Sequence, residues 1–478
     1  MNRQLLFLLL GIVLFVGGCT LAPKYTQPKA PIPTQWPRGA AYKDTRAIPG
    51  APTVPELKWK DFFVDKRLQE IIETALKNNL DLRLAALNIE RARALYGIQR
   101  ARLLPVVNAA GAGSKQRVPA DLSTTGESMT MEQYGVNLGI ASWEIDFFGR
   151  IRSLKDRALE EYLATEQARR SAQIALVAEV ARVYLTLAAD RSNLELAQST
   201  LESQQANYRL IKRRLELGLA TELDLRQAQT RVDAALRDIP RFTQYAAQDR
   251  NALNLLAGSP VPGQLLPVDL HSVSPFKGIS PGLSSEVLLN RPDIVAAEHQ
   301  LKGAYAFIGA ARAAFFPRIS LTAALGTASA DLSGLFKSGS GVWNFAPQVV
   351  LPIFDARVWA ALRVSKADQK IVLTQYEKAI QTAFREVADS LAVQGTINEQ
   401  VSAQQSLVNA TEETYRLSNK RYENGIDSYL NVLVAQQSLY AQQQVLIGLH
   451  LTRLANEVKL YAVLGGGGDQ PGAHQGES

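Results

Sequence analysis

The strongest constraint on the fold is an internal duplication of two long helix-forming runs, each interrupted by a single glycine. Gly218 and Gly425 occupy equivalent places 207 residues apart. Glycine suits such a place because the C-terminal cap of a helix often needs a positive φ angle. The flanking residues match at the same offset, with Tyr208-Arg209-Leu210 before the first glycine and Tyr415-Arg416-Leu417 before the second. The sequence therefore predicts two copies of one unit, each with a helical hairpin that turns at its glycine.

The duplication extends upstream of these turns with a slightly different spacing. Leu103-Leu104-Pro105 matches Phe315-Phe316-Pro317, and Arg100 matches Arg312, each pair 212 residues apart. Solenoids stack short units several times, so a long unit present twice indicates a duplicated domain whose halves pack side by side. We expect repeat 1 at residues 65–258, a proline-rich linker at 259–290, repeat 2 at 291–465 and a flexible C-terminus at 466–478.

Residues 1–18 have the features of a secretory signal peptide. Arg3 supplies the positive charge, and residues 5–16 form an apolar core that is too short to span a bilayer. Small residues precede Cys19, the only cysteine, as in the lipobox of bacterial lipoproteins; ordinary secretory cleavage beside an unrelated cysteine is the alternative. We expect Cys19 to become the lipidated first residue of the mature chain and residues 19–64 to form an extended tail.

Each repeat also contains two segments that alternate with a period of two. Tyr134, Val136, Leu138 and Ile140 fall on one face, and small or polar residues fall between them, which predicts a strand. The expected strands lie at about 105–117, 133–148, 317–332 and 341–355. Their length and uncharged second face are typical of strands that cross an outer membrane; a small soluble sheet with one wet face is the alternative.

Four strands cannot close a barrel, and an open edge in lipid leaves backbone groups without partners. Several copies of the chain must therefore share one barrel. A dimer gives eight strands and a trimer twelve. An eight-stranded barrel is filled by its own side chains, so the small residues on the second face favour the trimer.

Two proline-free runs, Ile151 to Leu217 and Val358 to Asn424, predict helices of about 100 Å each at 1.5 Å per residue. The returning runs are about half as long, and the first contains a candidate break at Pro240. The fold class is therefore an internally duplicated α+β membrane protein, mainly long helices with four strands per chain. The mean hydropathy of −0.07 predicts no transmembrane helix after the N-terminus.

The remaining composition argues against several function classes. The 52 basic and 45 acidic residues are spread along the helices, without the basic and aromatic patch of a nucleic-acid-binding protein. The four histidines show no metal-ligand spacing, and no Walker, nucleophile-elbow or dinucleotide motif occurs. We expect neither an enzyme nor a cofactor other than the lipid on Cys19.

Three stretches carry a family resemblance: residues 143–150, residues 291–294 and residues 308–317. They read Trp-Glu-Ile-Asp-Phe-Phe-Gly-Arg, Arg-Pro-Asp-Ile and Ile-Gly-Ala-Ala-Arg-Ala-Ala-Phe-Phe-Pro. The chain resembles the outer membrane factors of tripartite efflux pumps, within the TolC superfamily and closest to the OprM-like lipoproteins. The resemblance implies a homotrimer with one twelve-stranded barrel, a periplasmic α-helical tunnel and an equatorial collar. It also implies two partners, a periplasmic adaptor and an inner-membrane resistance-nodulation-division (RND) transporter that supplies the energy.

In such channels the helix tips close the periplasmic end and meet the adaptor. By position, the resemblance implies the adaptor-docking residues Gly218, Leu219, Ala220, Gly425 and Ile426. It likewise implies gate candidates at the tips: Asp224, Tyr422, Asp427, Leu430, Asn431 and Val434. Asp224 and Tyr422 match the partners of a closed-state contact. Asn431 and Val434 replace aspartates of several members, which leaves Asp427 as the candidate acidic ring; capping of the returning helix is its alternative role.

Two other functions remain open from the sequence. A protein-secretion exit duct would use the same architecture, although secretion channels of this kind usually lack a lipobox. A lipid-anchored coiled-coil scaffold or adaptor would have no use for alternating apolar strands in both repeats. The expected function is therefore an outer membrane, lipid-anchored efflux channel that extends into the periplasm and conducts drugs and other small toxic compounds passively.

Overall fold

The structure is a computed structural model that describes residues 20–43, 54, 57–279 and 284–468. Cys19, the expected lipid anchor, lies outside the described residues. The chain divides into two compact units. The first, here called the strand unit, comprises residues 1–29, 88–165 and 296–376, and the second, the helix unit, comprises residues 30–87, 166–295 and 377–478.

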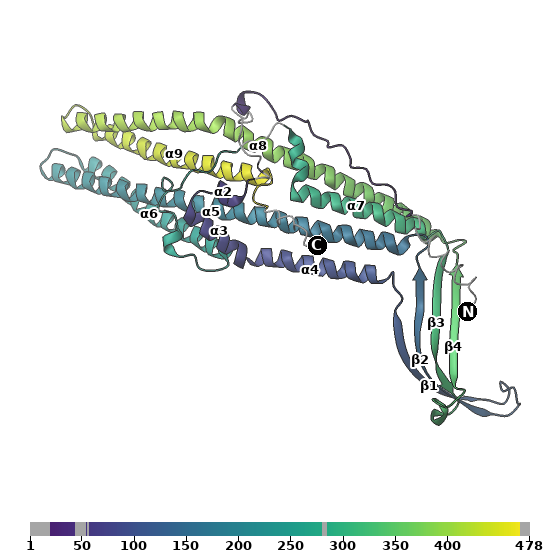
Figure 1. Ribbon diagram of the computed structural model, residues 1–478. Coiled ribbons are helices and arrows are strands. Elements are labelled where there is room, and N and C mark those ends of the chain that lie inside the picture. The colour runs from purple at the N-terminus through teal and green to yellow at the C-terminus, as the bar shows by residue number, and fades with distance from the viewer. Residues whose placement is uncertain (1–19, 44–53, 55–56, 280–283, 469–478) are drawn as a thin grey trace. The chain divides into compact units, whose positions relative to one another are not determined.

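The strand unit contains one antiparallel sheet in the order β1-β2-β3-β4 (Figure 1). The strands are β1 (Val107–Val118), β2 (Met129–Ile145), β3 (Arg318–Ser329) and β4 (Gly341–Val350). A short 3-10 turn, η5 (Leu332–Gly334), lies in the loop between β3 and β4. The two hairpins come from different repeats and pair through β2 and β3, so the sheet joins the repeats.

The strand register keeps one face of the sheet apolar. Leu138, Leu325 and Trp343 pair across β2, β3 and β4 and are 58%, 69% and 75% exposed within the single chain. The opposite face carries small residues, and two glycines there are required by close approach. A Cβ on Gly139 would lie 2.6 Å from the Ala323 carbonyl oxygen, and a Cβ on Gly326 would collide with the Val136 carbonyl. The two glycines thus allow the neighbouring backbones to approach closely.

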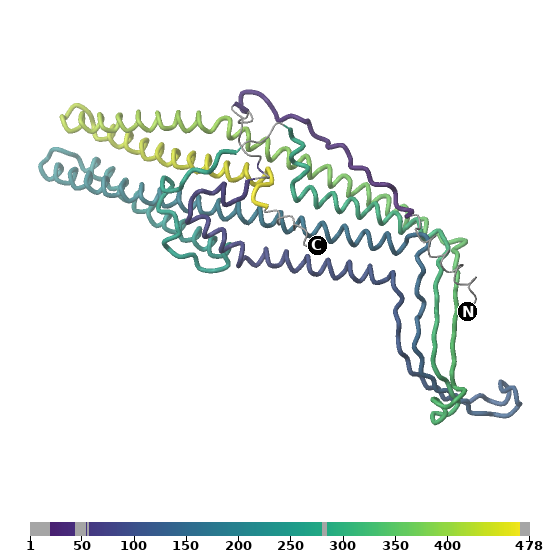
Figure 2. The backbone as a smooth tube through the Cα atoms, in the orientation of Figure 1, coloured from purple at the N-terminus to yellow at the C-terminus, as the bar shows by residue number. Residues whose placement is uncertain are grey.

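Long helices make up the rest of the chain. Helices with residues in both units are α4 (Leu80–Ala101), α5 (Arg150–Glu216), α7 (Pro292–Ala313) and α8 (Ala356–Glu423). The helix unit adds η1 (Ala40–Tyr42), α2 (Trp59–Phe62), α3 (Lys66–Asn78), α6 (Glu222–Ala257), η3 (Gly263–Leu265), η4 (Ser285–Asn290) and α9 (Tyr429–Val463). Figure 2 shows the two helical hairpins, α5–α6 and α8–α9, side by side within this unit.

Two local predictions need correction. Pro240 does not break α6, which continues through it; a proline removes only one backbone donor and Pro240 is exposed, so the helix tolerates the loss. One 18-residue window of α5 has the length and composition of a membrane span, which the whole-chain hydropathy concealed; 61% of that window is buried, as in a core helix.

Aromatic packing forms the core of the helix unit. The rings of Phe62 and Tyr461 stack at 4.1 Å between centroids, and Phe276 stacks on Phe62 at 5.3 Å. The Tyr461 hydroxyl donates to the Leu57 carbonyl at 2.6 Å, so its polar atom is satisfied although the side chain is buried. This cluster ties α2 to the end of α9.

The tail from residue 20 to residue 43 is fixed by specific contacts. In the strand unit, the Tyr25 hydroxyl donates to Glu298 at 3.0 Å and its ring meets Tyr305 edge-on. In the helix unit, Trp36 stacks on Phe384 with ring centroids 5.4 Å apart. Half-buried aromatic contacts of this kind hold an otherwise irregular segment in an extended path.

Candidate functional site

The two hairpin tips have the same turn geometry. Gly218 and Gly425 adopt φ angles of 71° and 73°, the left-handed region that favours glycine. The Leu219 N–H donates to the Arg214 carbonyl at 2.8 Å, and the Ile426 N–H donates to the Arg421 carbonyl at 2.9 Å. These bonds satisfy the last carbonyls of α5 and α8. Both hairpins therefore reverse within a few residues, at the positions that the duplicated glycines indicate.

A small apolar core, the tip cluster, holds the two hairpins together within one chain. It joins α5 and α6 to α9 through the buried residues Ile211, Ala228, Tyr429, Val432 and Leu433. The half-buried tip residues packed against it include Ala220 and Tyr422. Separating the hairpins would expose this cluster to water, so the cluster opposes their separation.

Tyr422 lies between the hairpins, where its ring makes two contacts. The Arg214 guanidinium lies 4.6 Å from the centroid of its ring, and the Tyr429 ring lies 5.1 Å away. Burial raises the pKa of Tyr422. A cation over an aromatic face contributes about 0.5–1 kcal/mol at a partly exposed site. Arg214 and Tyr429 were not among the residues predicted to act at the tips.

Asp224 is engaged within its own helix. Its carboxylate accepts from the Thr221 N–H at 2.9 Å and the Thr221 hydroxyl at 2.7 Å, while the Thr221 hydroxyl accepts from the Asp224 N–H. This is a capping box at the start of α6. Among the described residues of the single chain, no hydrogen bond joins Asp224 to Tyr422, so the expected contact between them is not made here.

Asp427 forms an ion pair across its own turn. The Arg421 guanidinium donates to both carboxylate oxygens, with Nε to Oδ2 at 2.6 Å and Nη2 to Oδ1 at 3.1 Å. Hydrogen bonding from Arg421 lowers the pKa of Asp427. The alternative role as a cap is wrong, because Ser428 occupies the N-cap of α9 and no side chain caps it. A paired guanidinium offsets much of the negative charge that an Asp427 ring would carry.

The tips expose several large apolar side chains among their charged residues. Leu430 and Val434 lie one turn apart on α9 and are 51% and 58% exposed, beside the exposed Asn431. Leu219 and Ile426 project from the two turns and are also exposed. Large apolar side chains left in water at one end of a hairpin mark a surface that contacts another chain or closes on itself.

The comparisons with known proteins agree with this arrangement. The family described as "Outer membrane efflux protein" matches residues 71–259 and 283–466. The chain belongs to this family.

Named members of the outer membrane efflux protein family align along the whole chain. The "Toluene efflux pump outer membrane protein TtgC" and the "Antibiotic efflux pump outer membrane protein ArpC", both from Pseudomonas putida, are each 49% identical over 470 residues, covering 98% of this chain and 96% of the relative. The open-state crystal structure of the Neisseria gonorrhoeae MtrE outer membrane channel has a TM-score of 0.83 and 37% identity, covering 94% of this chain and 98% of that one.

Membership in the outer membrane efflux protein family settles the general role of the chain. It is an outer membrane efflux channel, with the long helices and the four-stranded sheet per chain that the sequence predicted. The family role is transport and not catalysis. Within the described residues, no group of three or more His, Cys, Asp or Glu side chains is arranged to hold a metal ion.

Proposed function

We propose that the chain is one third of a trimeric exit duct in a tripartite RND-type multidrug efflux pump. In this proposal the duct carries small toxic compounds passively from the periplasmic pump complex to the exterior. The observation that supports it most is the four-stranded sheet itself. In the described residues, the outer edges of β1 and β4 pair with no strand, and the apolar face between them is exposed.

A membrane explains the apolar face, and other copies of the chain explain the edges. Backbone groups in lipid need partners, so β1 of one chain would pair with β4 of the next. Three chains give twelve strands, whereas two give eight and leave little room inside. The glycines and alanines on the opposite face then line an open lumen. Exposed leucines and Ile98 along α4 offer a second apolar surface for a neighbouring copy: Leu80, Leu84, Leu87, Leu95 and Ile98.

The helix tips supply the periplasmic gate of the proposed duct. Leu430 and Val434 would face the threefold axis, and the tip cluster would hold each pair of hairpins in the closed position. Gly218, Leu219, Ala220, Gly425 and Ile426 would meet the adaptor, because the turns expose their backbone and apolar side chains. Because Arg421 pairs with Asp427, this gate closes mainly by apolar contact and only weakly by charge.

The names of the relatives support the proposed cargo, and the N-terminal sequence supports the proposed lipid anchor. The relatives are named for toluene and antibiotic efflux, which supports small, largely apolar compounds as cargo. Lipidation of Cys19 would attach the tail that begins at residue 20 to a membrane leaflet.

The test is native mass spectrometry of the detergent-purified protein, followed by single-channel recording in a planar bilayer. The proposal predicts three times the mass of the mature chain and discrete channel openings. A monomer or dimer that conducts, or a trimer that never conducts, would contradict it. An Asn137→Arg variant should assemble and a Leu138→Arg variant should not. The two variants distinguish the face of β2 that lines the lumen from the face that contacts lipid.

A further inference from the structure

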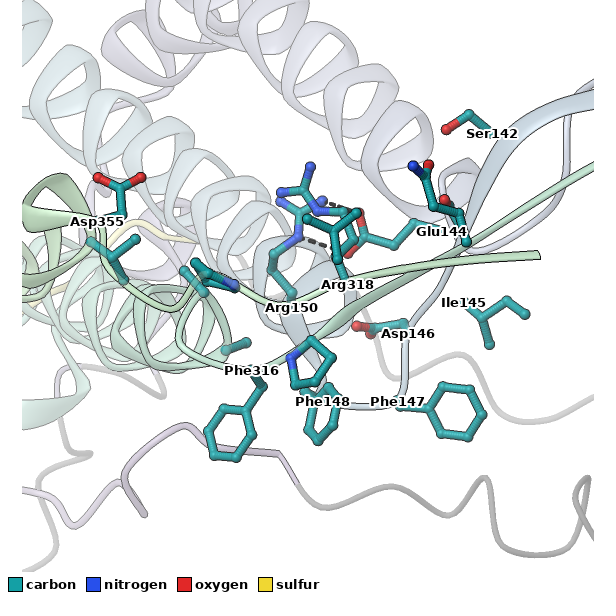
Figure 3. Close-up of a pocket in the computed structure, with 18 of the residues that line it drawn as sticks. Ser142, Glu144, Ile145, Asp146, Phe147, Phe148, Arg150, Phe316, Arg318 and Asp355 are labelled. Carbon is teal, nitrogen blue, oxygen red and sulfur yellow. Dashed lines mark hydrogen bonds and ion pairs between the residues drawn. The ribbon is translucent and has the colours of Figure 1, made fainter. Parts of the chain in front are cut away.

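A cavity of about 690 Å³ lies in the strand unit, where the strands meet the helices (Figure 3). Its charged lining consists of four arginines and three carboxylates: Arg102, Arg150, Arg318, Arg357, Glu144, Asp146 and Asp355. The volume falls in the range of about 300–1,000 Å³ that is typical of sites for small organic molecules. None of these residues belongs to the candidate gate.

The carboxylates of this cavity are already engaged. Arg150 donates to Glu144 with Nε to Oε1 at 2.8 Å and Nη2 to Oε2 at 2.6 Å. Asp146 accepts the first N–H groups of α5 and pairs with Arg152 at 3.2 Å. Asp355 accepts from Arg357 at 2.8 Å. Each negative charge therefore has an arginine as its own partner.

Two arginines remain with little compensation. Arg318 lies 3.4 Å from Glu144 Oε2, an oxygen that Arg150 already holds, and its side chain is 61% exposed. Figure 3 shows Arg150 and Arg318 converging on the one carboxylate. Arg102 donates to the Gln99 amide at 3.3 Å, and among the described residues no carboxylate lies within ion-pair distance of it. The cavity thus carries an excess of guanidinium groups.

The strand register places the cavity's polar strand residues on the small-residue face. Glu144, Ser320 and Gln348 pair in one row across β2, β3 and β4. Arg318 is two residues before Ser320, on the same face. Beyond this row the face carries only uncharged residues, such as Asn137, Thr322, Ala324, Asn344 and Ala346. Arg318 and Glu144 are therefore the two charges at the base of an otherwise neutral surface.

Aromatic rings complete the lining. Phe148 and Phe316 stack with centroids 4.8 Å apart, and Phe147 is 39% exposed. Guanidinium groups bind carboxylates and sulfonates through two parallel hydrogen bonds, and aromatic faces bind apolar rings. The combination fits a ligand with an acidic group at one end and an aromatic body at the other.

We propose that this cavity is a luminal binding site for aromatic organic anions, with Arg318 as the main recognition residue and Arg102 beside it. The inference rests on the proposed trimeric duct, in which three copies of Arg318 would form a ring at the base of the barrel. The ring makes the lumen favour anions over cations. It also gives acidic aromatic compounds a transient site between the helical tunnel and the barrel.

The experiment is single-channel recording in neutral phosphatidylcholine bilayers, which contain no competing anionic lipid. The variants are Arg318→Gln, Arg318→Lys and the control Lys337→Gln, which removes the same charge in the β3–β4 loop. In a KCl gradient around 0.1 M, Arg318→Gln should lower the chloride-to-potassium permeability ratio about two- to fourfold, and the effect should shrink at 1 M salt. Lys337→Gln should leave the ratio unchanged.

Naphthalene-2-sulfonate serves as the organic probe. It should interrupt the wild-type current in a concentration-dependent way, and Arg318→Gln should lose the blockade. Arg318→Lys should keep the ion selectivity but weaken the blockade, because lysine lacks the two-pronged donor. Normal openings with unchanged selectivity and blockade in Arg318→Gln would overturn this inference and leave the duct intact. Absence of openings in the wild type would instead overturn the proposed function.

Discussion

Replacing Tyr429 by alanine should open the periplasmic gate. Tyr429 is 3% exposed and belongs to the tip cluster with Ile211, Ala228 and Leu433. The cluster joins α5 and α6 to α9, so the Tyr429 ring bridges the two hairpins. Removing the ring leaves a cavity between elements that must separate when the gate opens.

The magnitude follows from the burial of the ring. Truncating a buried aromatic side chain to alanine costs about 3–5 kcal/mol. If roughly half of that loss falls on the contact between the hairpins, the closed state loses about 2 kcal/mol per chain, a shift of roughly 30-fold toward the open state. Three chains that open together would add to the effect.

Tyr429→Phe is the matched control. The Tyr429 hydroxyl is buried without a hydrogen-bond partner among the described residues. Removing it keeps the ring and should change the closed state by only about 0–1 kcal/mol, in the stabilising direction. Phenylalanine should therefore behave as the wild type or open slightly less often.

The assay combines two readouts. Single-channel recordings give the open fraction and conductance, and vancomycin susceptibility of expressing cells reports entry of a large compound. Circular dichroism melting verifies that each variant is folded. A folded Tyr429→Ala variant with wild-type conductance would refute the role of the cluster. Equal opening by the phenylalanine variant would show that the hydroxyl, and not the ring, holds the tips.

Three further outcomes are expected. Cys19→Ser with a cleavable signal should still give trimers but lose metabolic palmitate labelling, and persistent labelling would contradict the lipid site. Burial, with the nearby Asp249, raises the pKa of Asp190 to about 6. The folded protein therefore binds the extra proton between about pH 4 and 6, so stability falls as the pH rises through that window. Asp190→Asn should raise the melting temperature at pH 7.5 and flatten the dependence of stability on pH. An unchanged pH profile would show that the Asp190–Asp249 pair does not cause this dependence. Leu138→Arg should cost about 2–4 kcal/mol and block assembly, whereas Asn137→Arg should not; equal impairment would contradict the membrane face.

The elements themselves were predictable because their signals are local. The period of two around Val136 and the glycines at residues 218 and 425 depend only on neighbours in the sequence. Duplication strengthened both signals, since each pattern appears twice. The four-stranded contribution per chain followed from the same alternation.

The contacts at the tips depend on geometry that the sequence does not display. Arg421 reaches Asp427 only because the chain reverses at Gly425 between them. Arg214 and Tyr422 lie 208 residues apart in the sequence and meet only where the two hairpins pack together. From the sequence alone, a carboxylate near a turn fits three roles equally well: a helix cap, a member of an acidic ring, or one half of an ion pair.

The cavity at the base of the sheet was hidden for a similar reason. Glu144 and Arg150 stood within a stretch singled out for its family resemblance, but Arg318 belongs to the other repeat. Only the pairing of β2 with β3 brings the second arginine to the same carboxylate.

The central claim is that three copies of the chain surround one lumen lined by the small-residue face of the sheet. The most direct test is single-channel recording of Asn137→Cys in a Cys19→Ser background, during addition of a positively charged thiol reagent that cannot cross the membrane. Cys19 is the only natural cysteine, so each chain then carries one reactive thiol. The account predicts three discrete downward steps in conductance, one per chain. Any other number of steps, or blockade of Leu138→Cys instead, would contradict it.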